Sequence, residues 1–210
     1  MKLLTVLVLL SMLTLGSTIL SADDNTDTTT SPEVQIAKLF ELEAAFHSGV
    51  SVHNYVDGDS AEVINQRIRD VLSLWAEDGT LDLESSTYEF NGMYVGRGSL
   101  DDPSLCPPPS SNWDNRGTIC TLYKYVASYF KPGAKLIALA PPYKTRIAVN
   151  GTSGTLYFEC HYFDVGVDPA TGLPLWKAKT HINFDGSVIQ INSRWYFWNA
   201  KASKVGVPVP

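Results

Sequence analysis

The chain has 210 residues, of which 44% are hydrophobic, and it carries 16 Lys and Arg against 22 Asp and Glu, for a formal net charge of −6. This acidic balance argues against a nucleic-acid or anionic-membrane partner, because such surfaces attract cationic proteins. The sequence lacks the G-x-S-x-G, glycine-rich phosphate-loop and H-E-x-x-H motifs. Nucleophilic hydrolysis and nucleotide chemistry are therefore not supported, and no metal or cofactor is expected.

The first 31 residues predict export. Lys2 precedes an apolar run from Leu3 to Leu15, and small residues follow. This is a signal-peptide pattern, and the run is short for a membrane span. We expect a signal peptide over residues 1–22 and a disordered polar leader over 23–31, with a retained anchor as the alternative. The mature protein is then secreted, or periplasmic in a bacterium, without membrane attachment.

Two packed helices are predicted next. Pro32 and Glu33 begin the first, because proline suits the first helical position and an acid suits the first turn, and its apolar spacing runs toward Tyr55. Asp59 and Glu62 begin the second. Its apolar stripe consists of Ile64, Ile68, Val71, Leu72 and Trp75. A third helix is predicted over residues 119–130.

The rest of the chain predicts strands. After Trp75 the chain is expected to turn at Gly79, and Leu81 and Leu83 then alternate with acids. Further strands are expected within residues 134–140, 143–151, 152–165, 175–184 and 188–199, separated by turns that include Asp185-Gly186. Helices followed by a meander indicate an α+β fold, in which the helices cover one face of a curved antiparallel sheet.

Three cysteines in an exported chain suggest one disulfide and one free thiol. Cys106 and Cys120 flank a Pro- and Ser-rich loop that a crosslink would stabilise, whereas Cys160 lies in an apolar strand. We therefore pair Cys106 with Cys120; the alternative is three free thiols in a reducing compartment. The N-G-T sequence at Asn150 is a glycosylation acceptor on a predicted turn, if the source is eukaryotic.

Three segments together resemble the SnoaL-like family of the nuclear-transport-factor-2-like (NTF2-like) superfamily: "WAEDGTLDL" at 75–83, "YVGRGSL" at 94–100 and "INSRWYF" at 191–197. The resemblance implies an α+β cone over residues 32–200, followed by a C-terminal tail over 201–210. In such a cone a curved sheet wraps a pocket that isomerases, dehydratases and polyketide cyclases use for small hydrophobic molecules. It also implies a homodimer formed through the sheet. The leader and the cysteine-flanked insertion depart from the family.

Strand alternation governs how the segment "FECHYF" at 158–163 is interpreted. Cys160 and His161 point to opposite faces, so they cannot form a joint ligand or nucleophile pair, and Cys160 is expected in the core. If the flanking strands pair about the centre of the next loop, His161 faces His181 and Glu159 faces Asn183. This patch is either a proton-transfer site or a polar part of the outer or subunit-interface face. Two histidines and one acid are few ligands for a metal site.

Other candidate residues have structural alternatives. The resemblance places Asp57 where several superfamily members keep a pocket acid, although it also suits a helix cap. Asp78 is expected to stabilise a turn, and Arg97 to hydrogen-bond nearby backbone or carboxylate groups. The candidate substrate-binding residues, which are otherwise core residues, are Tyr55, Trp75, Tyr88, Tyr123 and Phe158.

Two function classes remain. In the first, Asp57, His161 and His181 are catalytic, and one of them moves a proton beside a carbonyl or hydroxyl of a small apolar substrate, as an isomerase, dehydratase or cyclase does. In the second, the chain is a non-catalytic ligand-binding or dimerisation module and the histidines belong to its surface. The expected partners are a small hydrophobic molecule and a second copy of the chain.

Overall fold

The computed structural model describes residues 30–56, 60–85, 90–112, 114–129, 136–139, 142–168 and 170–206. The predicted signal peptide, most of the predicted leader, Asp57 and Tyr88 lie outside the described residues. In the part of the chain that the structure describes, no helix combines the length and apolar character that a membrane crossing requires.

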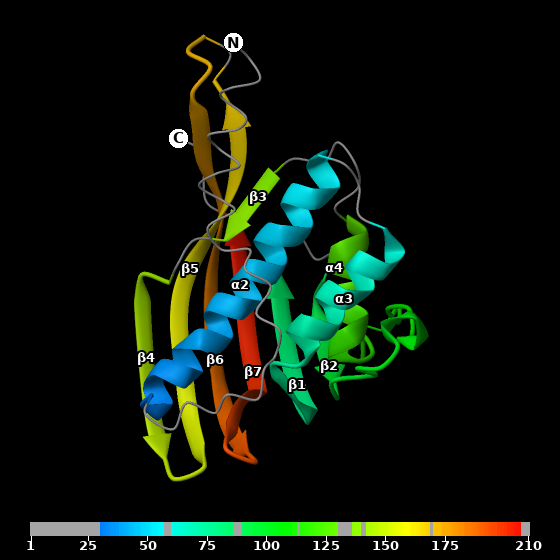
Figure 1. The fold of residues 1–210 in the computed structure, drawn as a ribbon, viewed down its shortest axis with the longest axis vertical. Helices are drawn as coiled ribbons and strands as arrows, with labels where there is room; N and C mark the ends of the chain where they lie inside the picture. The colour runs from blue at the N-terminus through cyan, green and yellow to red at the C-terminus, as the bar shows by residue number, and fades with distance from the viewer. Residues whose placement is uncertain are drawn as a thin grey trace.

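Three α-helices of the described residues lie over one face of a sheet, as predicted (Figure 1). They are α2 (Pro32–Val56), α3 (Ala61–Leu72) and α4 (Ile119–Tyr129). The start of α3 differs from the prediction, because its N-cap is Ser60, whose hydroxyl accepts a hydrogen bond from the backbone N–H of Val63. Its end differs as well: the helix stops at Leu72, and Trp75 begins a strand instead of continuing the helical stripe.

In the described residues, seven strands form one sheet in the order β2-β1-β7-β6-β5-β3, and β4 also pairs with β5. They are β1 (Trp75–Ser85), β2 (Gly92–Val95), β3 (Leu136–Leu139), β4 (Lys144–Asn150), β5 (Ser153–Val167), β6 (Pro174–Ile191) and β7 (Arg194–Gly206). The predicted antiparallel meander of the last three strands is confirmed. The parallel pairing of β1 with β7 joins the first strand to the last. The β5–β6 hairpin extends past the rest of the sheet (Figure 1).

The predicted turn at Gly79 is wrong. Gly79 lies inside β1, where the pairing with β7 shifts register between Trp75 and Thr80. A Cβ atom at this position would lie 3.0 Å from the carbonyl oxygen of Ala76, so the glycine permits a close backbone approach at an irregular point of the strand. The chain therefore bends locally without leaving the sheet.

The predicted turn at Asp185-Gly186 is also wrong. The strand β6 continues to Ile191, with a register shift between Gly186 and Val188. The chain turns instead at Asn192 and Ser193, whose φ angles are 50° and 66°. A two-residue hairpin favours positive φ at both central positions, and asparagine adopts this conformation more readily than most residues.

The predicted domain boundary at residue 200 falls inside β7, so residues 201–206 belong to the sheet and not to a tail. Ala202 pairs with Leu83 of β1 on one side, and Lys204 pairs with Ile182 of β6. The apolar run "RWYFWNA" ends at residue 200, and the residues after it are less hydrophobic. The strand pattern in the sequence therefore ended before the strand does.

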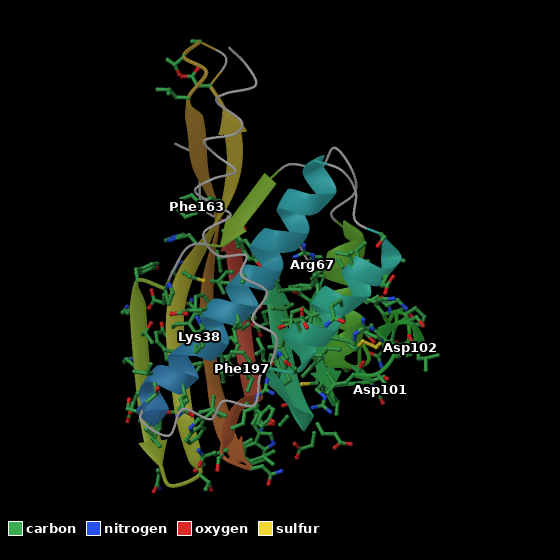
Figure 2. All side chains as sticks on the ribbon, in the orientation of Figure 1. Lys38, Arg67, Asp101, Asp102, Phe163 and Phe197 are labelled. Atoms are coloured by element: carbon green, nitrogen blue, oxygen red, sulfur yellow. A yellow bond between two sulfur atoms is a disulfide. The ribbon has the colours of Figure 1, made fainter. Side chains whose placement is uncertain are left out.

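The predicted alternation along β5 is confirmed. Leu156, Phe158 and Cys160 are buried on the face that the helices cover, and His161 is partly exposed. Side chains fill the space between this face and the helices, with Phe197 of β7 among them (Figure 2). The core therefore lies between the helix layer and one face of the sheet.

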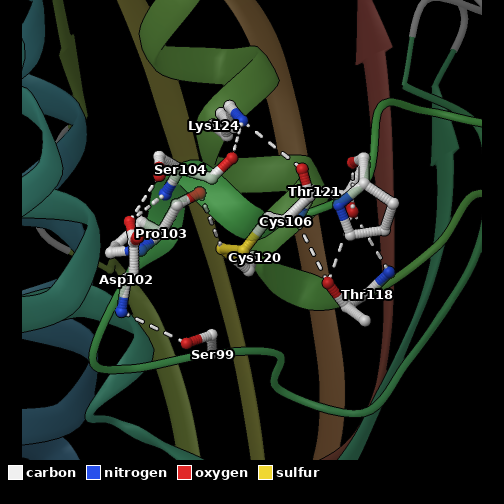
Figure 3. Close-up of a disulfide and its surroundings, with 10 residues drawn as sticks. Ser99, Asp102, Pro103, Ser104, Cys106, Thr118, Cys120, Thr121 and Lys124 are labelled. Carbon is white, nitrogen blue, oxygen red and sulfur yellow. Dashed lines mark hydrogen bonds between the residues drawn. A yellow bond between two sulfur atoms is a disulfide. The ribbon is translucent and has the colours of Figure 1, made fainter.

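The predicted disulfide between Cys106 and Cys120 is confirmed, and Cys160 is a buried free cysteine. Figure 3 shows how the crosslink joins the loop after Asp102 to the first turn of α4. The Lys124 ammonium donates hydrogen bonds to the carbonyl oxygens of Ser104 and Cys106, at 2.9 and 3.3 Å. The disulfide and these hydrogen bonds hold a proline-rich loop that has little apolar surface to bury.

Removal of the disulfide in a Cys106→Ala, Cys120→Ala variant is expected to lower the free energy of unfolding by about 3 kcal/mol, because the unfolded chain regains the freedom of the closed loop. Chemical denaturation of wild type and variant measures the difference. A reducing agent should destabilise the wild type to the same extent and leave the variant unchanged. Equal stability of the two proteins without reductant would show that the crosslink contributes nothing.

Candidate functional site

A cavity of about 60 Å³ lies between the helices and the sheet. We call it the central cavity. Its apolar walls are formed by Phe40, Trp75, Leu81, Leu83, Leu122, Val126, Phe158, Ile182, Phe184, Phe197 and Ala202, and its remaining lining residues are Glu43, His47, Tyr123, Cys160, Tyr162 and Lys204. The site is thus mostly apolar, with a few polar groups that can orient a ligand.

The polar centre of the cavity is a pair on α2. The imidazole Nε2 of His47 lies 2.7 Å from Oε1 of Glu43, one helical turn earlier. The His47 side chain is 7% exposed and the Glu43 side chain 20% exposed. The Tyr123 hydroxyl lies 3.5 Å from the same Glu43 oxygen, and the Trp75 indole N–H donates to the Tyr123 hydroxyl at 3.2 Å.

The two oxygens of the Glu43 carboxylate differ in their contacts. Both hydrogen-bond contacts use Oε1, and no described residue donates a hydrogen bond to Oε2. Among the residues that the structure describes, the carboxylate is thus held through one oxygen only.

The charge of Glu43 is set by opposing effects. Burial raises the pKa of its carboxyl, but the adjacent His47, the hydrogen bond from it, the charge of Lys204 and the Tyr123 hydroxyl outweigh burial and hold the pKa below its ordinary value of 4.5. At neutral pH Glu43 is therefore an ionised carboxylate facing an apolar cavity. Such a group can accept a proton from a ligand that excludes water.

Burial disfavours the charged form of four other lining residues. Burial raises the pKa of Tyr123 and of Tyr162 well above the ordinary value, so both hydroxyls stay protonated and can donate hydrogen bonds. Burial raises the pKa of the Cys160 thiol to about 12. Cys160 is therefore a neutral wall residue and a poor nucleophile. Burial lowers the pKa of Lys204, although the charge of Glu43 opposes this effect.

A second polar group lies on the opposite face of the sheet. We call it the outer-face cluster; it consists of Tyr143, Lys144, Tyr157, Glu159, His161, His181 and Asn183. The predicted register is confirmed: His161 pairs with His181, and Glu159 pairs with Asn183. The two imidazole rings have centroids 5.1 Å apart, and the Tyr143 ring stacks on His161 at 5.2 Å.

Glu159 organises the outer-face cluster. The Lys144 ammonium donates to its Oε1 at 2.8 Å, the Tyr157 hydroxyl donates to the same oxygen, and the Tyr143 hydroxyl donates to its Oε2 at 3.1 Å. These hydrogen bonds, led by that of Lys144, lower the pKa of Glu159 to about 2. The charges of the cluster are thus satisfied within the cluster. His161 and His181 do not line the central cavity, so their catalytic role stays a prediction that their position does not favour.

The remaining predicted residues are placed as follows. Trp75, Tyr123 and Phe158 line the central cavity, while Tyr55 lies in α2 at a position whose side chain is not described. Arg97 donates from Nη1 to the carbonyl oxygen of Trp75 at 3.3 Å, which confirms the expected hydrogen bonding to nearby backbone. Asp78 is exposed and lies inside β1, so it does not stabilise a turn as expected. Asn150 is exposed as well, and its glycosylation stays a prediction.

Four lining residues were not predicted as site residues from the sequence: Glu43, His47, Tyr162 and Lys204. Glu43 and His47 stand four residues apart on a helix face that is otherwise apolar, and this spacing was the available signal. Lys204 follows Ala200 and Ala202 in strand alternation, but the domain boundary predicted at residue 200 excluded it. Tyr162 lies on the same face of β5 as Phe158 and was counted only as part of an aromatic strand.

No protein-family model matches the chain, and no curated protein sequence matches it. Solved structures do. A domain of unknown function with a cystatin-like fold from Nostoc punctiforme has a TM-score of 0.50 at 10% identity and covers 83% of this chain and 78% of its own. An NTF2-like protein with a cystatin-like fold from Novosphingobium aromaticivorans has a TM-score of 0.42 at 13% identity, over 83% of this chain and 90% of its own. At such identities the likeness concerns the fold alone. The protein has a cystatin-like α+β fold.

Proposed function

We propose that the central cavity binds a small, mostly apolar carbonyl compound and that Glu43 removes a proton from the carbon beside its carbonyl group. The observation that carries this proposal is the ionised Glu43 carboxylate, which is hydrogen-bonded through one oxygen to His47 and faces apolar walls with the other oxygen unbonded to any described residue. The proposed reaction class is proton transfer, as in an isomerase, dehydratase or cyclase.

The volume of the cavity limits the ligand. About 60 Å³ has room for about four waters or for a molecule of a few non-hydrogen atoms. A larger substrate would require lining side chains to move. The aromatic and aliphatic walls favour a hydrocarbon portion, whereas the protonated Tyr162 hydroxyl is available to donate a hydrogen bond to a carbonyl oxygen.

The pair on α2 suits the removal of a proton. The hydrogen bond from His47 to Oε1 orients the carboxylate, and Oε2 is the oxygen available to the substrate. After proton transfer the glutamic acid is neutral, and the negative charge develops on the carbonyl oxygen of the ligand. A donated hydrogen bond at that oxygen stabilises this charge more strongly than the charge of the ground state, which lowers the barrier.

Acetone tests the proposal because it fits the cavity and its protons exchange with deuterium oxide only when a base removes them. Proton NMR should show exchange in the presence of the protein above the rate in buffer alone. The Glu43→Gln variant should lose this activity. The matched control is Glu41→Gln on the same helix, whose side chain is 60% exposed and paired with Lys38; it should keep the wild-type rate.

Two results would contradict the proposal. Equal exchange by wild type and Glu43→Gln would remove Glu43 as the base. Binding of acetone, seen as shifts of protein NMR signals from the central cavity, without any exchange above buffer would support the non-catalytic ligand-binding module instead.

We further propose that the protein works in an oxidising compartment outside the cytosol. The Cys106–Cys120 disulfide supports this, because disulfides persist in secreted and periplasmic proteins and are rare in the cytosol. Expression of the full chain in a host with a secretory pathway, followed by mass spectrometry of the medium and of cell fractions, tests it. A product retained in the cell with residue 1 intact would contradict export.

A further inference from the structure

Lys204 is a cation placed in the central cavity by the alternation of β7. Ala200 and Ala202 precede it on the buried face, and its strand partners are Ser85 of β1 and Ile182 of β6. Its neighbour on the other face, Lys201, is 56% exposed and pairs with Glu84 at 3.1 Å. Two lysines three residues apart on one strand thus have opposite environments: one faces water and carboxylates, and the other faces an apolar cavity.

The surroundings of the Lys204 amine are aromatic. Its Nζ lies 5.3 Å from the ring centroid of Tyr162 and 5.9 Å from that of Phe90. Among the described residues, none accepts a hydrogen bond from Nζ and none forms an ion pair with it within 4.0 Å. Glu43 lines the same cavity and attracts the ammonium form at longer range. An amine that faces a cavity and has no partner oxygen among the described residues can offer its donors and, when deprotonated, its lone pair to a ligand.

We infer that the Lys204 amine forms an imine with a small aldehyde or ketone bound in the central cavity. This inference rests on the proposed function, because it names the group that activates the carbonyl compound there. Burial favours the neutral form of the amine over the ammonium, and the neutral form is the nucleophile.

The step balances without an oxidant or a reductant. The Nζ lone pair attacks the carbonyl carbon, the carbonyl oxygen takes a proton to become a hydroxyl, and the nitrogen loses a proton. The hydroxyl then leaves as water with a second proton, while the nitrogen lone pair forms the C=N bond. One water is released. The protonated imine withdraws electrons from the carbon next to the former carbonyl carbon. A proton on that adjacent carbon becomes more acidic, and a carboxylate such as Glu43 can remove it.

Reductive trapping tests the inference with the same probe. The wild-type protein is incubated at neutral pH with acetone and sodium cyanoborohydride, which reduces an imine to a stable isopropyl amine, and labelled peptides are quantified by mass spectrometry over time. Lys204 should be labelled several-fold faster than Lys201. In denatured protein the two lysines should be labelled at the same rate. If Lys204 in the folded protein is labelled no faster than Lys201, the inference is wrong.

The pH dependence of labelling gives a second criterion. Burial lowers the pKa of Lys204, whereas the hydrogen bond and charge of Glu84 raise the pKa of Lys201. As the pH is raised from neutral, labelling of Lys204 should therefore begin at lower pH than labelling of Lys201. Coincident onset at the two sites would contradict a special reactivity of Lys204.

The two proposals fail separately. Preferential labelling of Lys204 without any acetone exchange would retain the imine and remove proton abstraction by Glu43. Exchange that persists in Lys204→Arg, together with slow labelling of Lys204 in the wild type, would remove the imine and retain Glu43 as a base. Lys201→Arg is the matched variant, and it should change neither exchange nor the labelling of Lys204.

Discussion

Replacing Glu43 by glutamine is expected to slow acetone exchange by about 10²- to 10⁴-fold, the usual contribution of a positioned general base. Glutamine keeps the shape of the side chain and can still accept the hydrogen bond from His47, but it cannot take a proton. The rate from proton NMR in deuterium oxide measures the effect, and the melting temperature of the variant shows whether the fold is kept. A drop of less than about threefold would be too small for a general base.

The pH dependence follows from the same carboxylate. Because the pKa of Glu43 is held below 4.5, the base is ionised at neutral pH, and the exchange rate should fall only as the pH drops below this ordinary value. Stability changes in the same direction. A carboxyl whose pKa is lower in the folded state stabilises the fold above the pKa of the unfolded chain, and this contribution is lost as pH falls through the folded pKa. The difference in free energy of unfolding between wild type and Glu43→Gln should therefore shrink on acidification.

Replacing Phe158 by alanine is expected to lower the free energy of unfolding by about 3 to 5 kcal/mol. The side chain is 4% exposed, its ring stacks on Phe184 with centroids 4.7 Å apart, and the Phe40 ring of α2 lies 4.2 Å away on centroid distance. Truncation removes this buried surface, so the transfer free energy of the ring is lost. The larger void that it leaves beside the central cavity destabilises the fold further.

Chemical denaturation measures the effect of Phe158→Ala, with Leu173→Ala as the control. Leu173 is 61% exposed, and its truncation should change the free energy of unfolding by no more than about 0.5 kcal/mol. A change below about 1 kcal/mol in Phe158→Ala would mean that the void collapses or that the ring does not anchor α2 to the sheet. Acetone binding to a folded Phe158→Ala protein should also weaken, because the ring is part of the wall.

The disulfide and the face assignment of "FECHYF" were both predictable, for local reasons. Cys106 and Cys120 flank a loop that has little else to hold it, and Cys160 lies in an apolar strand. Side chains alternate strictly along a strand, so Cys160 and His161 had to separate onto two faces. The pairing of His161 with His181 followed from the centre of one hairpin loop, since register in a hairpin depends on the turn that joins its strands.

The errors in element boundaries have physical causes as well. Glycine is typical of turns, and this led to the predicted turns at Gly79 and Gly186. Both residues lie instead in irregular stretches of long strands, where the missing side chain lets backbone or aromatic groups approach closely. The end of β7 was missed because its last residues are held by pairing with β1 and β6, and the small residues Ala200 and Ala202 are only a weak local signal of strand alternation.

By itself, the sequence determined the fold class, the presence of the described helices, the closing meander, the disulfide and the faces on which Leu156, Phe158, Cys160 and His161 lie. These follow from periodicity, helix starts and the spacing of cysteines. Only the tertiary structure decided which residues share the central cavity. Glu43 comes from α2, Tyr123 from α4 and Lys204 from the end of β7. Alone, a glutamate four residues before a histidine resembles an ordinary helix pair, and a lysine after two alanines resembles a strand end. Packing α2 against a sheet in which the first strand lies parallel to the last removes these groups from water and brings them together, and desolvation then changes their pKa values.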